Sequence, residues 1–541
     1  MSKIAGYLQE HLSGEVMTGV DARRYFATDN SMLNLPPAAV IYPRNEHDVR
    51  KAARFTWQLA ERGRVVPMTA RGSGTDQSGA PLTDGLAIVF PAHQNRILEL
   101  DSKSGAVTVE PGINFGKLQQ TLQTHGRWLP VAPASAEYSS VGGAVANNSV
   151  GMYALKYGDM GAYVRGLRVV LANGEVINTG RLSKRELSKK LGLATFEGEI
   201  YRQIDTLIEE NKELIATLER ATTRNSAGYN LLDVRRKDGS FDLSPLFIGS
   251  QGTLGIITEV ILNTEPHDPG STLFMAGFDS PQAVQNAINE LRAQSTMPAA
   301  IEFVDKHLLT QVQAANPNVL GGIVQPPFPA ILLLVEYDNA DAHLKRSLKH
   351  AQKILEKYSL HVVSETETAK QDQFWKLRHA STWLLTQNDG QRRALPLFGS
   401  AIVPPENWSK LLQGVYDIFA RAKLPVGAWG HAGDGQLSVA PLLDLSQVGD
   451  RQIAFRMLDE YVKLVIALGG STSGDGRLHA PYLEQVYGTE AYNLLRKVKQ
   501  IFDPYGTLNP GVKIGVSMDD VKPLLRSTFN LEHLYDHLPR S

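Results

Sequence analysis

Three glycine-rich stretches in the first half of the chain carry the residue types best suited to holding phosphate groups. They are ARGSGTDQSGAP (70–81), PASAEYSSVGGAVANNSVGMYALKYG (133–158) and FIGSQGTLGIITEV (247–260), and each borders an apolar, β-like segment. Glycine lets the backbone approach a ligand closely, and closely spaced backbone N–H groups can cradle a pyrophosphate without a cation. One such stretch is more often a plain turn, but three together predict a ligand that contains pyrophosphate.

A fourth turn, GGSTSGDGRLHAPYL (469–483), follows the apolar run YVKLVIAL and gathers glycines, hydroxyls, an aspartate, an arginine and a histidine. Another histidine, His431, lies in WGHAGDGQLSVAP. Imidazole is suited to accepting a hydroxyl proton near neutral pH. These two segments are therefore the candidates for acid–base chemistry.

The sequence lacks the residues that several other kinds of catalysis require. The chain contains no G-x-x-x-x-G-K-S/T phosphate loop, no G-x-G-x-x-G turn and no G-x-S-x-G nucleophile elbow. It has no cysteine, which excludes thiolate nucleophiles, disulfides and iron–sulfur clusters within this chain. Any redox chemistry must use an organic cofactor. The net charge of −1 gives no electrostatic reason to expect nucleic acid.

The secondary structure that the sequence predicts around these residues changes near residue 265. Before it, short β-rich segments alternate with glycine turns and with the helix NEHDVRKAARFTWQLAERG, for which Asn45 is a suitable N-cap. After it, strands and long helices follow in an order that predicts a ferredoxin-like sheet with helices on one face. At 541 residues the chain should form several domains, of the α+β class.

In order and spacing, the glycine stretches resemble the flavin-binding loops of the FAD-linked oxidoreductases that include vanillyl-alcohol oxidase, D-lactate dehydrogenase, the glycolate oxidase D-subunit and D-2-hydroxyglutarate dehydrogenase. FWKLRHA, WGHAGDGQLSVAP, the 469–483 turn and FDPYGTLNPGVK match landmarks of the D-2-hydroxyacid dehydrogenase branch. The resemblance implies a vanillyl-alcohol oxidase-type FAD domain (1–265), a ferredoxin-like cap or substrate domain (266–500) and a C-terminal segment (501–541) that folds back on the FAD domain.

The resemblance also implies which residues contact FAD. Arg71 and the turn after it would wrap the pyrophosphate, and the other two loops and the C-terminal landmark would line the flavin. Because Thr75 stands where covalent members often have a histidine, we expect non-covalent FAD. The predicted cofactor residues are Arg71, Gly72, Ser73, Gly74, Thr75, Asp76, Ser78, Gly79, Pro133, Ser139, Gly142, Gly143, Asn148, Gly151, Tyr157, Gly158, Gly252, Gly255, Ile257 and Asn509.

The chain departs from the branch where the branch binds its metal. Family members carry GHxGDGNxH and GGSTSGEHGDGR, whereas this chain has Ser438 in place of the second histidine and lacks Glu-His-Gly between Gly474 and Asp475. A lone imidazole is a poor site for a divalent cation, and Asp434 in a G-D-G turn more often accepts backbone N–H bonds. We therefore predict no metal.

The remaining catalytic candidates are Arg378, His431 and His479. Arg378 matches the family's carboxylate-binding arginine and can bind a carboxylate through two parallel hydrogen bonds. His431 would lie at the mouth of the site as the proton acceptor. His479 follows the shortened turn, where a structural role is the competing interpretation. With the cation and the family's base lost, a D-2-hydroxyacid should bind but reduce the flavin slowly or not at all.

The leading interpretation is an FAD-dependent oxidoreductase related to D-2-hydroxyacid dehydrogenases and acting without a divalent metal. One alternative is oxidation of another alcohol or phenol, with Tyr138, Tyr153, Trp375 and Trp429 lining the pocket. The other is a catalytically impaired flavin-binding protein. The expected partners are a small carboxylate substrate and an electron acceptor, and a homodimer stays open. The N-terminus lacks signal-peptide features and no window is apolar enough to span a membrane, which predicts a cytoplasmic protein.

Overall fold

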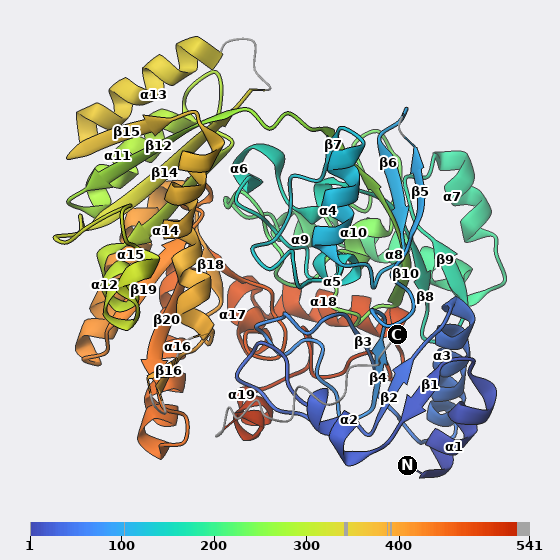
Figure 1. Ribbon diagram of the computed structural model, residues 1–541. Coiled ribbons are helices and arrows are strands. Elements are labelled where there is room, and N and C mark those ends of the chain that lie inside the picture. The colour runs from blue at the N-terminus through green and yellow to red at the C-terminus, as the bar shows by residue number, and fades with distance from the viewer. Residues whose placement is uncertain (1, 102, 340–343, 387, 390–391, 527–541) are drawn as a thin grey trace.

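Two lobes lie side by side in the computed structural model, which describes residues 2–101, 103–339, 344–386, 388–389 and 392–526 (Figure 1). The first lobe contains the three glycine-rich stretches, and the second contains the helices from α11 (Pro281–Arg292) to α16 (Val448–Ala467). None of the helices among the described residues has the length and apolar composition that a membrane span requires.

A four-stranded sheet begins the first lobe, in the order β1 (Glu15–Met17), β2 (Ala39–Tyr42), β4 (Leu86–Val89), β3 (Met68–Arg71). Strands β2, β4 and β3 are parallel. Helices α1 (Ser2–His11) and α3 (Glu46–Glu61) pack on this sheet. The predicted N-cap of α3 is confirmed, since the Asn45 side chain accepts the Asp48 N–H. The first glycine stretch starts where β3 ends.

A second sheet of the first lobe is antiparallel, in the order β5 (Ile97–Asp101), β6 (Ala106–Val109), β10 (Ile256–Asn263), β8 (Val164–Val170), β9 (Val176–Asn178). Helices α4 (Phe115–Thr124), α5 (Val141–Ala146) and α8 (Phe196–Glu210) share its apolar core. The second and third glycine stretches flank this core, so both sheets of the lobe contribute a loop to the same region.

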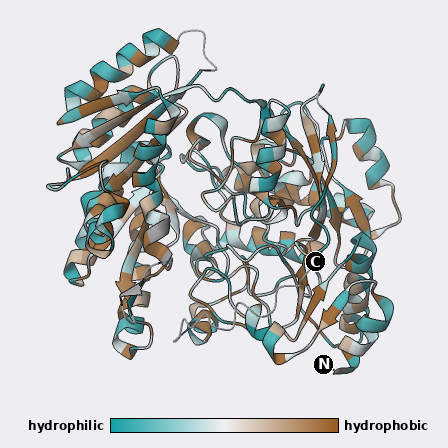
Figure 2. Ribbon diagram, viewed as in Figure 1, coloured by the Kyte–Doolittle hydropathy of each residue, from teal (hydrophilic) through white to brown (hydrophobic). Residues whose placement is uncertain are grey.

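The second lobe confirms the ferredoxin-like prediction. Four antiparallel strands run in the order β15 (His361–Glu365), β12 (Ser271–Phe278), β14 (Ile331–Asp338), β13 (Ala300–Asp305). The crossover helices α11 (Pro281–Arg292) and α13 (Leu344–Tyr358) pack against each other on one face. Figure 2 shows the outer side of α13 as hydrophilic.

The sheet extends beyond this unit through β19 (Val426–Gly430), β20 (Gln436–Leu443), β17 (Arg392–Ala394) and β16 (Asn388–Asp389), with β18 (Ser400–Ile402) pairing with both β20 and β21 (Ser471–Ser473). Helices α15 (Trp408–Arg421) and α16 (Val448–Ala467) join the face that carries α11. The prediction of helices on one face only is wrong, because α12 (Lys306–Ala315) and α14 (Thr368–Thr386) cover the other face.

The division between the lobes agrees with the change in sequence style near residue 265. The last strand of the first lobe, β11 (Glu265–Pro266), pairs with β7 (Arg127–Trp128), and β12 then starts the second lobe. The domain bounds 1–265, 266–500 and 501–541 stay a prediction. Helices α17 (Leu483–Tyr487) and α18 (Thr489–Phe502) pack in the core of the first lobe, because their apolar faces join α8 and β10. The chain therefore returns to the first lobe at Leu483.

Asp305, at the end of β13, leads to a prediction for stability against pH. The side chain is fully buried, where it accepts the Leu308 N–H and the Tyr416 hydroxyl, and burial raises its pKa from 3.8 to about 7. The folded state therefore holds a proton that the unfolded chain releases, so this contribution to stability is complete below about pH 4 and is lost as the pH rises through about 7.

We expect wild type to lose about 2–4 kcal/mol more unfolding free energy than Asp305→Asn between about pH 5 and about pH 8, at about 1.4 kcal/mol per pKa unit. Urea unfolding of both proteins at the two pH values measures the difference. Parallel pH dependences in the two proteins would contradict the buried, protonated carboxyl.

Candidate functional site

The three glycine stretches meet in the first lobe. The Thr75 hydroxyl lies 3.0 Å from the Ser139 hydroxyl, and Asn147 donates through Nδ2 to Asp76 Oδ2 (3.0 Å). Gln251, from the third stretch, donates through Nε2 to Asn147 Oδ1 (2.9 Å). Side-chain hydrogen bonds therefore connect the first stretch to the second and the second to the third, as the prediction of a shared ligand site requires.

Asn509, from the C-terminal landmark, ties the first and third stretches together. Its buried side-chain amide donates to the Ala80 carbonyl (2.9 Å) and the Gln251 carbonyl (2.7 Å), and its oxygen accepts the Thr69 hydroxyl (3.0 Å). Its amide nitrogen therefore bonds to both loops, while its oxygen bonds to the strand β3 that leads into the first of them. The return of the C-terminal segment thus completes the loop cluster.

In the second lobe, a buried carboxylate joins two of the predicted catalytic residues. Glu302, on β13, has no exposed surface; Oε2 accepts Arg378 Nε (2.6 Å) and Oε1 lies 2.5 Å from His431 Nδ1. Arg378, on α14, also donates through Nη1 to Ser381 Oγ (3.1 Å). Arg378, Glu302 and His431, hereafter the Arg–Glu–His triad, come from a helix, a strand and a turn that are far apart in sequence.

A chain of neutral polar groups starts at the backbone of His431. Gln436 Oε1 accepts the His431 N–H (2.7 Å), Gln436 Nε2 donates to Ser438 Oγ (3.0 Å), and Ser438 Oγ lies 2.8 Å from Ser400 Oγ. Because the N–H can only donate, it fixes the orientation of the Gln436 amide. Hydroxyls and an amide thus stand beside the triad.

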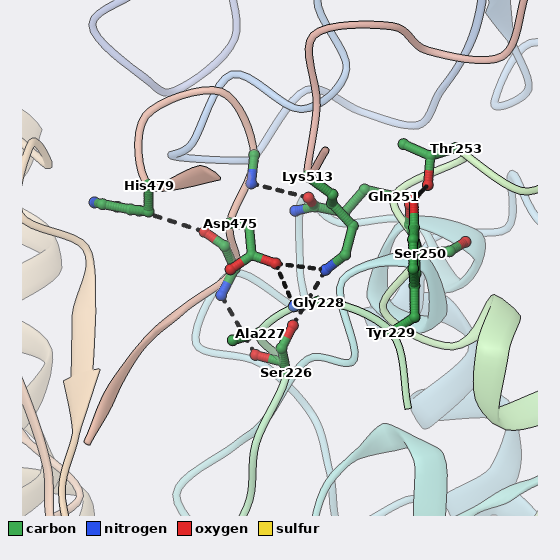
Figure 3. A network of polar contacts seen from close by, with 12 residues as sticks. Ser226, Ala227, Gly228, Tyr229, Ser250, Gln251, Thr253, Asp475, His479 and Lys513 are labelled. Carbon is green, nitrogen blue, oxygen red and sulfur yellow. Dashed lines mark hydrogen bonds and ion pairs between the residues drawn. The ribbon is translucent and has the colours of Figure 1, made fainter. Parts of the chain in front are cut away.

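The shortened turn of residues 469–483 is anchored by a buried ion pair (Figure 3). Asp475 Oδ2 lies 2.8 Å from Lys513 Nζ and accepts the Gly228 N–H (2.7 Å). The side chains of Lys513 and Asp475 are 0% and 1% exposed. The next residue, Gly476, donates its N–H to Gln251 Oε1 (2.9 Å), so the turn is also bonded to the third glycine stretch.

His479 lies inside the protein, 2% exposed, with its ring between two backbone carbonyls. Nε2 is 3.2 Å from the Leu397 oxygen and Nδ1 is 3.4 Å from the Gly474 oxygen. Burial lowers the pKa of His479, which favours the neutral ring. Arg477 donates to the Leu82 carbonyl (2.7 Å), and burial lowers its pKa to about 10.

Comparison with known families identifies the cofactor of this chain. Residues 37–180 match the family described as FAD binding domain, and residues 269–512 match FAD linked oxidases, C-terminal domain. The chain belongs to the FAD-linked oxidoreductases. The first lobe is therefore the FAD domain and the second the cap domain of an FAD-dependent oxidoreductase.

Relatives of this FAD-linked oxidoreductase share its length to different extents. Glycolate oxidase subunit GlcD of Bacillus subtilis (strain 168) is 28% identical over 480 residues, 88% of each chain. D-lactate dehydrogenase of Archaeoglobus fulgidus is 27% identical over 92% of this chain and 96% of the relative. D-2-hydroxyglutarate dehydrogenase of Escherichia coli (strain K12) is 29% identical over 93% of this chain, which spans only 50% of that relative.

Solved structures support the fold. p-Cresol methylhydroxylase superposes with a TM-score of 0.69 at 15% identity over 96% of this chain and 97% of that chain. 4-Ethylphenol oxidase from Gulosibacter chungangensis gives 0.67 at 16% identity over 96% and 98%. The α+β, vanillyl-alcohol oxidase-type fold predicted from the sequence is confirmed.

The first glycine stretch fits the pyrophosphate of FAD. Among the described residues no acceptor faces the backbone N–H groups of Ser73, Gly74 and Thr75, which leaves three consecutive donors for an anion. At Gly72 a Cβ atom would lie 2.1 Å from Ser140 Oγ, so only glycine lets the two loops meet this closely. Free donors and close backbone approach are the features that a pyrophosphate needs.

Two other predicted residues of this stretch, Asp76 and Arg71, form hydrogen bonds that stabilise the loop and the segment next to it. Asp76 Oδ1 accepts the N–H groups of Ser78 (2.7 Å) and Ala80 (3.1 Å), which holds the turn from within. The guanidinium of Arg71 donates to the Phe26 carbonyl (3.1 Å), and burial lowers its pKa. Direct contact of Arg71 with the pyrophosphate stays a prediction, and its observed bonds fix the segment behind the loop.

Three predicted glycines lie where neighbouring segments touch the backbone. A Cβ atom would lie 2.5 Å from Pro111 Cβ at Gly142, 2.2 Å from the Ala132 oxygen at Gly151, and 2.5 Å from Val169 Cγ1 at Gly255. Tyr157 donates its hydroxyl to Asp338 of the cap domain (2.5 Å) and thus links the domains. The other predicted positions in the second and third loops are Pro133, Gly143, Asn148, Gly158, Gly252 and Ile257.

Asp434 pairs with a guanidinium. Its Oδ2 lies 2.9 Å from Arg224 Nη1, with side chains 2% and 12% exposed, where the sequence predicted backbone N–H partners. Within the part of the chain that the structure describes, no group of three or more His, Cys, Asp or Glu side chains could hold a metal ion. The absence of a metal itself stays a prediction.

Glu302 and Arg224 are the site residues that sequence reasoning missed. Glu302 carries one usable signal, since it is the charged residue within the apolar run AAIEFV, and a buried strand tolerates such a residue only when it is paired. Arg224 lies in a polar segment, TTRNS, that reads as an ordinary loop. Its partner comes from the other domain, so no local pattern could reveal the pair.

Proposed function

We propose that this FAD-dependent oxidoreductase oxidises a D-2-hydroxyacid to the 2-oxoacid without a divalent metal. The observation that carries the proposal is the Arg–Glu–His triad, which places a guanidinium and an imidazole against one carboxylate. Relatives named for glycolate, D-lactate and D-2-hydroxyglutarate support the substrate class. FAD supplies a two-electron acceptor for the hydrogen that leaves C2.

Arg378 would bind the substrate carboxylate. Glu302 and Ser381 occupy Nε and Nη1, and no acceptor among the described residues faces Nη2. The free edge of the guanidinium can still form charge-assisted hydrogen bonds to a carboxylate. A small monocarboxylate suits a cation whose charge Glu302 already balances in part.

His431 would accept the hydroxyl proton. Glu302 occupies Nδ1, and among the described residues Nε2 has no hydrogen-bond partner, so one ring nitrogen is available to a ligand. His479 is less suited to this role, because both of its ring nitrogens face backbone carbonyls. The Gln436–Ser438–Ser400 chain supplies neutral polar groups near the position where the family binds its cation.

A second candidate is oxidation of another alcohol or phenol. Tyr153, Trp375 and Trp429 lie in one apolar cluster on the sheet face that also carries Glu302, whereas Tyr138 is 71% exposed. Glu336, on the neighbouring strand β14, is also buried, and burial raises its pKa to about 7. These aromatic side chains, together with a buried carboxyl group, would accommodate an uncharged aromatic substrate. A flavin-binding protein without turnover is the remaining alternative.

Anaerobic bleaching of the bound flavin separates these functions. We expect D-2-hydroxyacids to bleach it slowly and in the presence of EDTA, while their L-enantiomers do not, because the triad presents one guanidinium and one base from fixed positions. Faster bleaching by a phenol or a simple alcohol would favour the second candidate. No bleaching by any compound, together with unchanged flavin spectra, would contradict an oxidoreductase that uses this site.

A further inference from the structure

We propose that Glu302 is a positioning residue, which holds the proton of His431 on Nδ1 and fixes the guanidinium of Arg378 by one edge. The inference rests on the proposed function, in which these two side chains bind substrate. Glu302 lies on β13, between β14 and β19 of the cap sheet, and is 0% exposed. A strand inside a sheet holds a side chain more rigidly than a loop does.

The hydrogen-bond chemistry of the three groups places a proton on His431 Nδ1. A guanidinium only donates, so Glu302 Oε2 accepts from Arg378 Nε. An ionised carboxylate only accepts, so the 2.5 Å contact to Oε1 requires the proton to lie on His431 Nδ1. In the neutral ring the lone pair is then on Nε2, which is the tautomer that can take a proton from a substrate hydroxyl.

The same carboxylate orients Arg378. Its bond to Nε and the bond from Nη1 to Ser381 Oγ hold two nitrogens of a planar group, so the direction of the third, Nη2, is set. A substrate carboxylate bound at that edge lies at a fixed position relative to His431. Glu302 thereby fixes the position of Arg378, which binds the substrate, relative to His431, which accepts the proton.

Glu302→Gln tests this with almost no change in shape. Because Arg378 Nε must still donate, the new amide oxygen has to face Arg378, and the amide NH2 then faces His431 Nδ1. That nitrogen becomes an acceptor, and the proton moves to Nε2. We expect the rate of flavin reduction by D-lactate to fall by about 10²–10⁴-fold, with FAD content and the dissociation constant for D-lactate changing much less.

A direct readout is ¹⁵N NMR of histidine-labelled holoprotein, with the His431 signals assigned by comparison with His431→Gln. Wild type should show the proton on Nδ1 and Glu302→Gln should show it on Nε2. The matched control is Asp305→Asn, which removes another buried carboxyl group from β13 without touching the triad and should keep the wild-type tautomer and rate.

The outcomes are separable from those of the proposed function. A wild-type His431 proton on Nε2, or wild-type reduction rates in Glu302→Gln, would overturn the role of Glu302. If no hydroxyacid reduces the wild-type flavin, the substrate assignment fails, while the tautomer comparison still decides whether Glu302 sets the protonation of His431.

Discussion

Replacing Lys513 by methionine is expected to lower the free energy of unfolding of the FAD-loaded protein by about 3–5 kcal/mol. The substitution leaves Asp475 as a buried carboxylate without its counterion. The backbone N–H of Gly228 still donates to it. A buried charge without its counterion costs far more than a surface pair contributes, because no water replaces the lost partner. Urea unfolding followed by flavin fluorescence and circular dichroism measures the loss.

Lys463→Met is the matched control for this prediction. Lys463 pairs with Asp459 on α16, but the two side chains are 63% and 42% exposed, so its removal should cost about 0–1 kcal/mol. The double variant Asp475→Asn with Lys513→Met removes both charges, keeps an acceptor for Gly228, and should be more stable than Lys513→Met alone. Equal losses for Lys513→Met and Lys463→Met would show that the buried pair does not anchor the turn.

The features that sequence predicted well are those that local patterns determine. Asn45 caps α3 because the cap residue and the N–H it accepts are three positions apart. The ferredoxin-like unit follows from the order of its strands and helices. The loops also came from short-range information, since glycine runs next to strands create the free backbone donors found at residues 73–75.

The features that sequence missed depend on pairs of side chains brought together by the fold. Asp475 and Lys513 complete a buried ion pair across the turn, and Asp434 meets Arg224 from the other domain. His479 was a candidate base because of its residue type, but its burial between two carbonyls depends on the position of residues 397 and 474. No periodicity or spacing in a single sequence encodes such contacts.

The shortened turn itself can be used to test what this site has lost. We expect insertion of Glu-His-Gly after Gly474, combined with Ser438→His, to create a chelatable metal site and to raise the rate of flavin reduction by D-lactate by about 10²-fold or more. The insertion has room, because Gly474 is partly exposed and a Cβ atom there would meet nothing within 4 Å. His431 can contribute Nε2, since Glu302 occupies Nδ1.

The unmodified protein provides the baseline for this prediction. D-Lactate should perturb its flavin spectrum through Arg378 and reduce it slowly, with no effect of EDTA, because a base is present but no cation stabilises the alkoxide. A control insertion of Ala-Ala-Gly after Gly474 with Ser438→His should bind no zinc or manganese and gain no rate. Loss of activity on chelation in the unmodified protein, together with stoichiometric metal by elemental analysis, would show that ligands from elsewhere in the chain complete a metal site at His431.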